Sequence, residues 1–255
     1  MGSFVPELHR MPGSQHDLYA LARLWQWEGT ARRLLPGVVA AGDVGAVFQP
    51  VLGLDGGVPR IRGYEALARF PVAAGVPVGV WFRVAADMGL ACDLELAAAE
   101  KAVDGSPRML AESLLFLNAS LTVAVDLAGA MVPRVPSRLV IDIPYLGVDE
   151  RECAAVVGGL RGLGALVAVD DVPMRGLPAL RPTLTELRPD YVKVDVITGL
   201  DDDPMARVDL AEAVIWCEEW GITVIAERVE KVTDVQILYD LGVRSVQGYS
   251  LARPA

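Results

Sequence analysis

Short apolar segments alternate with longer helical segments along most of the sequence, and this alternation limits the fold more than any other feature. Strands are expected at residues 46–54, 61–70, 114–118, 138–143, 166–171, 191–196, 222–227 and 245–249. Helices are expected at residues 81–90, 94–103, 121–128, 151–163, 177–187, 204–220 and 232–241. Helical crossovers between successive strands imply that those strands are parallel. Eight strands within 255 residues favour an α/β fold of the TIM-like (β/α)8 barrel type, with an open doubly wound sheet as the alternative.

The N-terminal part departs from this alternation. Asp55-Gly56-Gly57 is typical of a tight turn, so the first two strands form a hairpin and one strand of the barrel runs antiparallel. Ahead of the hairpin, apolar residues at helical spacing predict a helix at 17–35. This helix packs across one end of the barrel or, alternatively, binds a protein partner or a second copy of the chain in a homodimer. The predicted organisation is an N-terminal tail and helical extension at 1–42, followed by a barrel domain at 43–255.

Charge and composition exclude several classes of protein. A net charge of −10 disfavours binding to a nucleic-acid polymer, which requires a basic surface. His9 and His16 both precede the first predicted strand, so a histidine-rich zinc centre inside the fold is not expected. No apolar run reaches the roughly 18 residues that span a bilayer. Three widely spaced cysteines, Cys92, Cys153 and Cys217, indicate a reducing compartment, and we expect a cytoplasmic protein without a membrane anchor.

Polar side chains recur near the end of almost every predicted strand. They are Glu65, Asn118, Asp142, Asp170 with Asp171, Lys193 with Asp195, Glu227 and Gln247. Singly, these residues have ordinary explanations, such as helix caps or a surface ion pair. In a parallel barrel the strand ends converge on one face, and so many carboxylates with one lysine would repel one another unless cations intervened. Oxygen donors alone favour Mg²⁺ or Mn²⁺ over zinc, and paired divalent ions suit displacement at phosphorus.

An ordered series of short motifs runs from residue 48 to residue 249. It comprises Phe48-Gln49-Pro50, Glu65-Ala66-Leu67-Ala68-Arg69, Asn118-Ala119-Ser120, Asp170-Asp171, Lys193-Val194-Asp195, Ala226-Glu227-Arg228-Val229-Glu230 and Gln247-Gly248-Tyr249. The series resembles the EAL domain, a family of cyclic-di-GMP phosphodiesterases. The resemblance implies a barrel that opens cyclic-di-GMP at one phosphodiester bond and releases linear pGpG.

The resemblance also implies roles for individual residues. One Mg²⁺ or Mn²⁺ ion would be held by Glu65, Asn118, Asp142 and Asp170, and a second ion by Asp170, Asp171 and Glu227. Lys193 would position the attacking water or stabilise charge at the scissile phosphate, Glu227 is the candidate base, and Asp171 completes the catalytic set. The implied substrate contacts are Gln49, Leu67, Arg69, Asp195, Gln247 and Pro254.

Several positions depart from the family pattern. Asp142 and Tyr145 stand where the family has Glu, Val196 stands for an Arg, and Arg228 stands for a Gly. The loop after the Asp pair, usually Phe-Gly-Thr-Gly, reads Val172-Pro173-Met174-Arg175-Gly176, and in the family this loop couples homodimer formation to the second metal. These changes keep two alternatives open: a degenerate EAL domain that acts as a cyclic-di-GMP receptor or protein-interaction module, and another metal-dependent barrel enzyme acting on a phosphorylated substrate.

Overall fold

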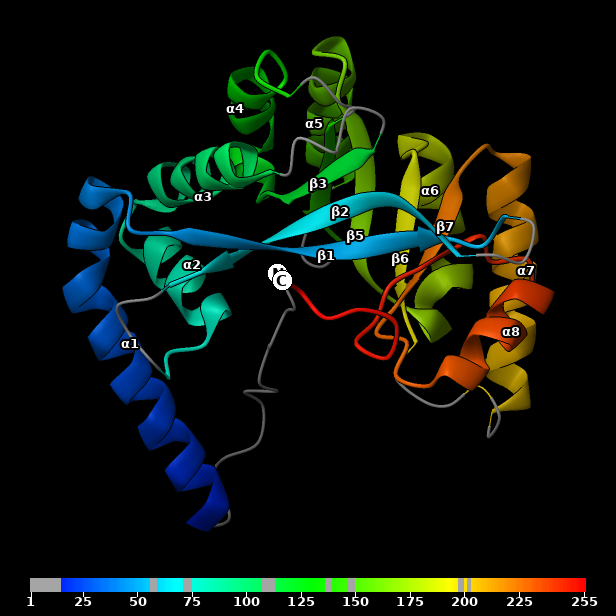
Figure 1. Ribbon diagram of the computed structural model, residues 1–255, viewed down its shortest axis with the longest axis horizontal. Coiled ribbons are helices and arrows are strands. Elements are labelled where there is room, and N and C mark those ends of the chain that lie inside the picture. Colours follow the sequence, from blue (N-terminus) through cyan, green and yellow to red (C-terminus); the bar gives the residue numbers. More distant parts are fainter. Residues whose placement is uncertain are drawn as a thin grey trace.

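The computed structural model describes residues 15–55, 59–70, 75–106, 113–135, 139–145, 150–196, 200 and 203–255. Within these residues, eight strands form one closed barrel in chain order (Figure 1). The first strand is antiparallel to both of its neighbours, and all the other neighbouring strands are parallel. The predicted (β/α)8 barrel with one antiparallel strand is therefore confirmed.

The strands lie close to the predicted positions. They are β1 (Gly45–Gly53), β2 (Arg60–Arg69), β3 (Leu114–Asn118), β4 (Leu139–Pro144), β5 (Leu166–Pro173), β6 (Tyr191–Asp195), β7 (Thr223–Glu227) and β8 (Ser245–Val246). Residue 138, the predicted start of the fourth strand, lies outside the described residues. β8 is shorter than predicted because the chain after it turns against the segment that follows β7. At Gly248 a Cβ atom would lie 2.2 Å from the carbonyl oxygen of Val229, so only glycine fits there.

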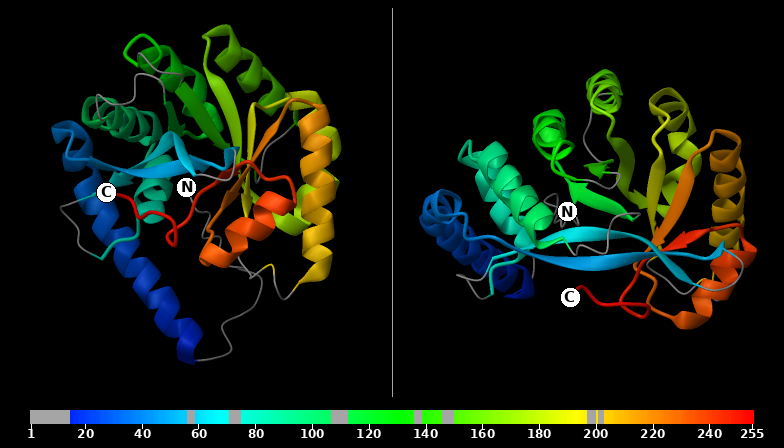
Figure 2. Two further views of the ribbon diagram at one scale, coloured as in Figure 1. Left: turned by 45° about the vertical axis from the view of Figure 1, so that its right-hand side comes forward. Right: turned by 45° about the horizontal axis from the view of Figure 1, so that its top comes forward.

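The helices cover the outer side of the strands (Figure 2). They are α2 (Val78–Asp87), α3 (Ala91–Gly105), α4 (Leu121–Met131), α5 (Glu150–Gly162), α6 (Arg181–Leu187), α7 (Pro204–Glu219) and α8 (Val232–Asp240). The predicted helix at 177–187 is divided, because a 3₁₀ helix (Met174–Leu180) precedes α6. Pro182 lies in the first turn of α6, where its missing N–H is tolerated.

The N-terminal helix is longer than predicted. α1 (Gln15–Ala41) contains Pro36 and extends away from the barrel at the lower left of Figure 1. Its second half buries Ala31, Leu35 and Val38 in a separate apolar cluster with Trp81 of α2 and residues of α3. This cluster packs the helix against one end of the domain, as the sequence predicted. The boundary between residues 42 and 43 stays a prediction.

Apolar side chains fill the barrel interior below its carboxyl end. They are Val51, Phe116, Val140, Ala168 and Ile225, all buried. Side chains two positions apart point to the same face of a strand. The residues two positions after the last four of these therefore also point inward, and they are Asn118, Asp142, Asp170 and Glu227. Because of this period of two, the polar side chains at the ends of four strands point into the same opening at the carboxyl end of the barrel.

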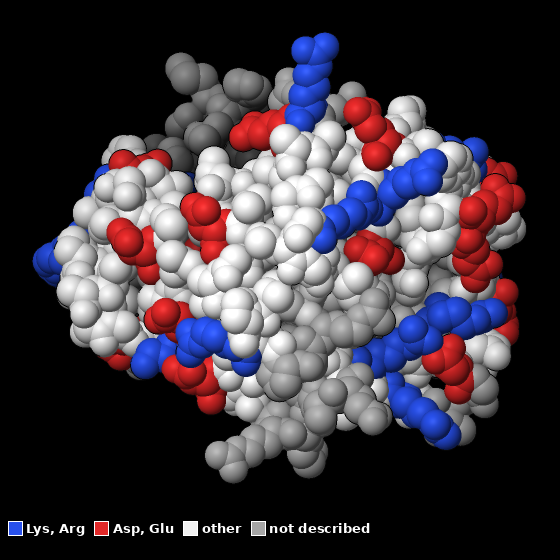
Figure 3. Space-filling view, turned by 90° about the horizontal axis from the view of Figure 1, so that it is seen from above, with Lys and Arg blue, Asp and Glu red and all other residues white. Residues whose placement is uncertain are grey.

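The charged surface is mixed rather than dominated by one sign. On the face seen in Figure 3, basic and acidic side chains are interspersed among uncharged residues. In the part of the chain that the structure describes, no helix combines the length and apolar character needed to cross a bilayer.

Candidate functional site

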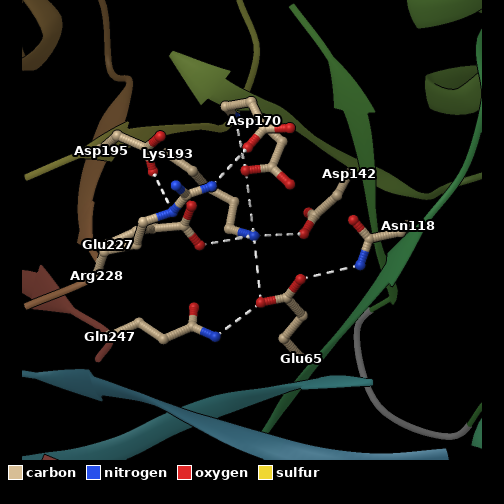
Figure 4. A network of polar contacts seen from close by, with 10 residues as sticks. Glu65, Asn118, Asp142, Asp170, Lys193, Asp195, Glu227, Arg228 and Gln247 are labelled. Carbon is tan, nitrogen blue, oxygen red and sulfur yellow. Dashed lines mark hydrogen bonds and ion pairs between the residues drawn. The ribbon is translucent and has the colours of Figure 1, made fainter. Parts of the chain in front are cut away.

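Lys193 lies at the centre of the carboxyl end of the barrel. Its Nζ atom is 2.8 Å from Glu227 Oε1, 2.9 Å from Asp142 Oδ2, 3.4 Å from Glu65 Oε2 and 3.5 Å from Asp170 Oδ1 (Figure 4). The side chain of Lys193 is 1% exposed. The structure thus brings together one buried ammonium group and carboxylates from β2, β4, β5 and β7.

Two amide side chains hold Glu65 in place. Asn118 Nδ2 donates to Glu65 Oε1 at 2.9 Å, and Gln247 Nε2 donates to Glu65 Oε2 at 2.7 Å. The position of Gln247 is set by the close contact between Gly248 and Val229. Glu65 is therefore fixed from both sides, with little freedom to turn away from the opening.

A β-bulge places two consecutive carboxylates at the rim. The pairing of β5 with β6 shifts between Val169 and Val172, so β5 carries one extra residue at this point. Asp171 has a φ of 57°, in the left-handed region, and its backbone N–H donates to Asp170 Oδ1 at 2.7 Å. Successive residues of a regular strand point to opposite faces, so the bulge is what directs both side chains to the opening.

Arg228 forms a second, more exposed centre of positive charge. Its guanidinium is 3.0 Å from Asp195 Oδ1 and 3.5 Å from Asp171 Oδ1, and its side chain is 49% exposed. Arg228 follows Glu227 directly and has a φ of 55°. The left-handed backbone turns this side chain across the rim towards β5 and β6 (Figure 4).

Burial and charge shift the pKa values of the central groups in different directions. Burial raises the pKa of Asp142 to about 8, although Lys193 opposes the shift. Burial likewise raises the pKa of Glu227 well above its ordinary value. Burial also acts against the ionisation of Asp170, but Lys193 and the N–H of Asp171 outweigh it and lower its pKa. For Lys193, the surrounding carboxylates outweigh burial and hold the pKa well above its usual value.

A cavity of about 510 Å³ opens above this cluster, within the size range of small-molecule sites. Four of the predicted substrate contacts line it, namely Gln49, Leu67, Arg69 and Gln247. Gln49 donates to the carbonyl oxygen of Ala252 at 3.3 Å, which ties β1 to the C-terminal segment. Pro254, also predicted as a contact, is not one of the lining residues.

Two further predicted residues lie outside the cavity lining. Asp142 is 1% exposed and pairs with Lys193, which is itself a lining residue. Asp195, predicted as a substrate contact, pairs with the lining residue Arg228. Neither of these carboxylates lines the cavity, but an oxygen of Asp142 lies close to oxygens of the lining residues Glu65 and Asp170.

The cavity also has lining residues that the sequence did not indicate. Glu95 of α3 is 4% exposed, accepts the Ser120 N–H at 2.8 Å, and has a pKa raised chiefly by burial. Phe82 and Tyr249 add aromatic surface to the wall. In the sequence, Glu95 is one of several charged residues of the predicted helix at 94–103, and nothing there distinguishes it as a site residue.

Glu65, Asp142 and Asp170 are arranged for a cation. One ligand oxygen from each lies within 4.8 Å of the others, and among the described residues this is the single group of three such ligands. Asp142 Oδ1 and Gln247 Oε1 are buried and have no hydrogen-bond partner in the described part of the chain. Oxygen donors of this kind suit Mg²⁺, Mn²⁺ or Ca²⁺, so the residues present fit a hard divalent ion. Asp171 and Glu227 do not join this group.

Of the positions that depart from the family pattern, Asp142 and Arg228 contact the site through their side chains, whereas Tyr145, Val196 and the start of the loop after the Asp pair do so through backbone atoms. Tyr145 N–H donates to the Asp170 carbonyl at 3.1 Å, and Val196 N–H donates to the Glu227 carbonyl at 3.1 Å. Val172 and Pro173 continue β5 and pair with β6 instead of leaving the strand after the Asp pair. Such contacts depend little on side-chain identity, so these substitutions are compatible with the fold.

A family model for the EAL domain matches residues 31–254. The chain belongs to the EAL domain family. The matched region begins within α1, ahead of the predicted domain boundary. No curated protein matches the sequence significantly.

Solved EAL domains share the fold of this chain. The EAL domain of FimX from Pseudomonas aeruginosa, bound to c-di-GMP, is 21% identical with a TM-score of 0.71, covering 88% of this chain and 96% of that one. The FimX EAL domain of Xanthomonas citri, in complex with c-di-GMP, is 17% identical with a TM-score of 0.74, covering 93% and 96%. A manganese and c-di-GMP complex of BlrP1 from Klebsiella pneumoniae is 25% identical with a TM-score of 0.69, covering 84% and 56%.

Proposed function

We propose that this EAL domain binds cyclic-di-GMP in its cavity and hydrolyses one phosphodiester bond to give linear pGpG, with Mg²⁺ or Mn²⁺ as cofactor. The observation that carries the proposal is the buried group formed by Glu65, Asp142 and Asp170 around Lys193 at the floor of the cavity. The c-di-GMP bound to the FimX domains, and the manganese with c-di-GMP in BlrP1, support the same ligand and the same type of ion.

The charge of the floor explains why a cation belongs to this function. Cyclic-di-GMP carries two phosphates, and the floor has four carboxylates against the single ammonium of Lys193. An anionic ligand is repelled by such a surface unless further positive charge is present. A bound divalent ion supplies that charge and lowers the pKa of a water in its shell.

The side chains of the site have separate proposed roles in ion binding, proton transfer and substrate binding. Glu65, Asp142, Asp170 and Asn118 would hold the ion, and Lys193 would keep the carboxylates oriented. Glu227, whose pKa is raised by burial, is the residue proposed to accept a proton from the attacking water. On the cavity wall, the roles proposed for Gln49, Leu67, Arg69 and Gln247 are contacts to the dinucleotide, and the guanidinium of Arg69 can donate two hydrogen bonds to a phosphate.

The proposal is tested by incubating the protein with cyclic-di-GMP and Mn²⁺ and measuring pGpG by chromatography. We expect product in the parent, no product in excess chelator, and a loss of at least about 100-fold in Glu65→Gln, because its new NH₂ group faces a donor and removes an ion ligand. Glu218→Gln, at an exposed position on α7, is the matched control. Product in chelator, or an active Glu65→Gln variant, would contradict the proposal.

A second candidate is a receptor that binds cyclic-di-GMP without hydrolysing it. The specific observation in its favour is that Arg228 already pairs with Asp171, a residue of the predicted catalytic set. Tight binding by calorimetry with no pGpG after many hours would establish this function. If cyclic-di-GMP does not bind with either Mg²⁺ or Mn²⁺, the remaining candidate is a protein-interaction module.

Association with other chains also remains a proposal. The predicted homodimer and the predicted protein partner at the N-terminal helix rest on sequence, and on α1 the side chain of Trp25 is 70% exposed. The cytoplasmic location rests on the cysteines: Cys92, Cys153 and Cys217 are all free thiols.

A further inference from the structure

Arg228 stands in a backbone conformation that normally belongs to glycine. Among the described residues, three residues other than glycine have a positive φ: Asp171, Arg188 and Arg228. Two of these three are neighbours at the rim of the cavity, where they form an ion pair of 3.5 Å. A residue with a Cβ atom is strained in this region, so such a conformation persists where the surrounding contacts compensate it.

The side-chain contacts of Arg228 compensate the strain of its left-handed backbone. Its Nε lies 3.0 Å from Asp195 Oδ1, and its second contact, through NH2, is to Asp171. The carboxylates come from β6 and β5, which are adjacent strands. Burial raises the pKa of Asp195, and Arg228 is the main charge that opposes this shift. The guanidinium thus places positive charge next to both of these carboxylates.

A divalent ion at the second predicted position would need the Asp171 carboxylate. That position was assigned to Asp170, Asp171 and Glu227, but Asp171 pairs with Arg228. In the described chain, only Glu65, Asp142 and Asp170 converge as a group of three possible ligands. The two halves of the rim therefore differ: one has carboxylates grouped for an ion, and the other has an arginine already in place.

We propose that the guanidinium of Arg228 takes the place of a second divalent cation, so that this chain binds one ion where two were predicted. The inference rests on the proposed function, because it assumes an ion at Glu65, Asp142 and Asp170. It assigns Arg228 as a positioning residue that holds Asp171 and Asp195 and supplies fixed positive charge at the side of the cavity. Its guanidinium would be present at any metal concentration.

The test is to count the Mn²⁺ ions bound per chain, by calorimetry and by metal analysis after equilibrium dialysis. We expect one ion in the parent and two in both Arg228→Gly and Arg228→Gln. The glycine variant relieves the backbone, whereas the glutamine variant removes the charge and keeps most of the length. Arg188→Gly is the matched control, because Arg188 also has a positive φ, of 48°, and contacts Trp220 at a distance from the rim.

Each other outcome overturns the inference in a recognisable way. Two ions in the parent would mean that Arg228 moves aside for the second ion. One ion in both Arg228 variants would mean that the second position is absent for another reason. A second ion in Arg228→Gly but not in Arg228→Gln would mean that the backbone, and not the charge, controls binding of the second ion. A second ion in Arg188→Gly as well would lead to the same conclusion. No ion in the parent would overturn the metal site of the proposed function itself, and this inference with it.

Discussion

The two cations at the carboxyl end of the barrel have similar partners but very different surroundings. Lys193 projects from the middle of β6, is 1% exposed, and lies among four carboxylates. Arg228 follows the last residue of β7, is 49% exposed, and pairs with two carboxylates. Both cations offset the repulsion between acidic side chains that a shared opening brings together.

Lys193 and Arg228 differ in what their removal would do to the protein. Ion pairs of a buried ammonium are not screened by water, so removing Lys193 leaves uncompensated charge inside the barrel. Ion pairs of the half-exposed Arg228 are screened, so its removal should change stability little and leave room for another ion. Lys193 is therefore part of the structure of the site, whereas Arg228 adjusts which cations the site holds.

Removing each cation in turn should give the largest contrast. Lys193→Met should lower the free energy of unfolding by about 3–5 kcal/mol in the absence of metal, because it strands buried carboxylates. For a domain of this size, this corresponds to a fall in melting temperature of roughly 10 °C. Arg228→Met should change stability by about 1 kcal/mol or less, since the guanidinium is half-exposed and water screens its ion pairs. Thermal denaturation in chelator measures both.

Lys101→Met on α3 is the control for the loss of an exposed lysine. Equal losses of stability in Lys193→Met and Arg228→Met would remove the distinction between the two cations. A stable Lys193→Met variant would show that the carboxylates neutralise themselves by binding protons.

The affinity for Mn²⁺ should depend on pH through Asp142. Its pKa in the folded protein is raised to about 8, so below that pH the carboxyl group is mainly protonated and an ion must displace the proton. Affinity should therefore rise as pH increases, by about tenfold per pH unit for each proton displaced, and level off above about pH 8. Calorimetry from pH 6 to pH 8 in buffers of different ionisation enthalpy measures the affinity and the protons released.

Asp142→Asn should bind Mn²⁺ more weakly and with a smaller dependence on pH. Arg228→Gln serves as the comparison. Because Arg228 does not contact Asp142, this variant should show the same pH dependence of Mn²⁺ affinity at the first ion site as the parent. An affinity that is independent of pH in the parent would place the ion away from Asp142.

Lengthening the side chain at position 142 should have the smallest effect. Asp142→Glu moves the carboxylate by about 1.5 Å towards the centre of the site. If the shorter ligand limits the ion site, hydrolysis should rise by a few-fold, and Asp93→Glu at an exposed position on α3 should leave it unchanged. Rates of pGpG formation test this directly. A variant slower than the parent would mean that the chain has adapted to Asp142.

The sequence predicted the Lys193 side of the site better than the Arg228 side. Asp142, Asp170 and Lys193 follow the period of two along their strands, and the alternation of strands and helices indicated that the strand ends meet. Both the barrel and its central carboxylates could therefore be predicted from the sequence alone.

The remaining features depend on geometry that has no such period. The bulge at Asp171 extends β5 to Pro173, although proline within a sequence usually argues against a strand. The direction of Arg228 is set by its left-handed backbone, and Glu95 reaches the cavity from a helix packed over β1 and β2. Each of these placements requires the three-dimensional arrangement of neighbouring elements.

The position of the cation itself tests the central claim most directly. Crystals grown with Mn²⁺ and cyclic-di-GMP should show, by anomalous scattering, one strong peak between Glu65, Asp142 and Asp170, with Arg228 still paired to Asp171 and Asp195. An absence of manganese at these three carboxylates, with the dinucleotide bound elsewhere on the protein, would contradict the account.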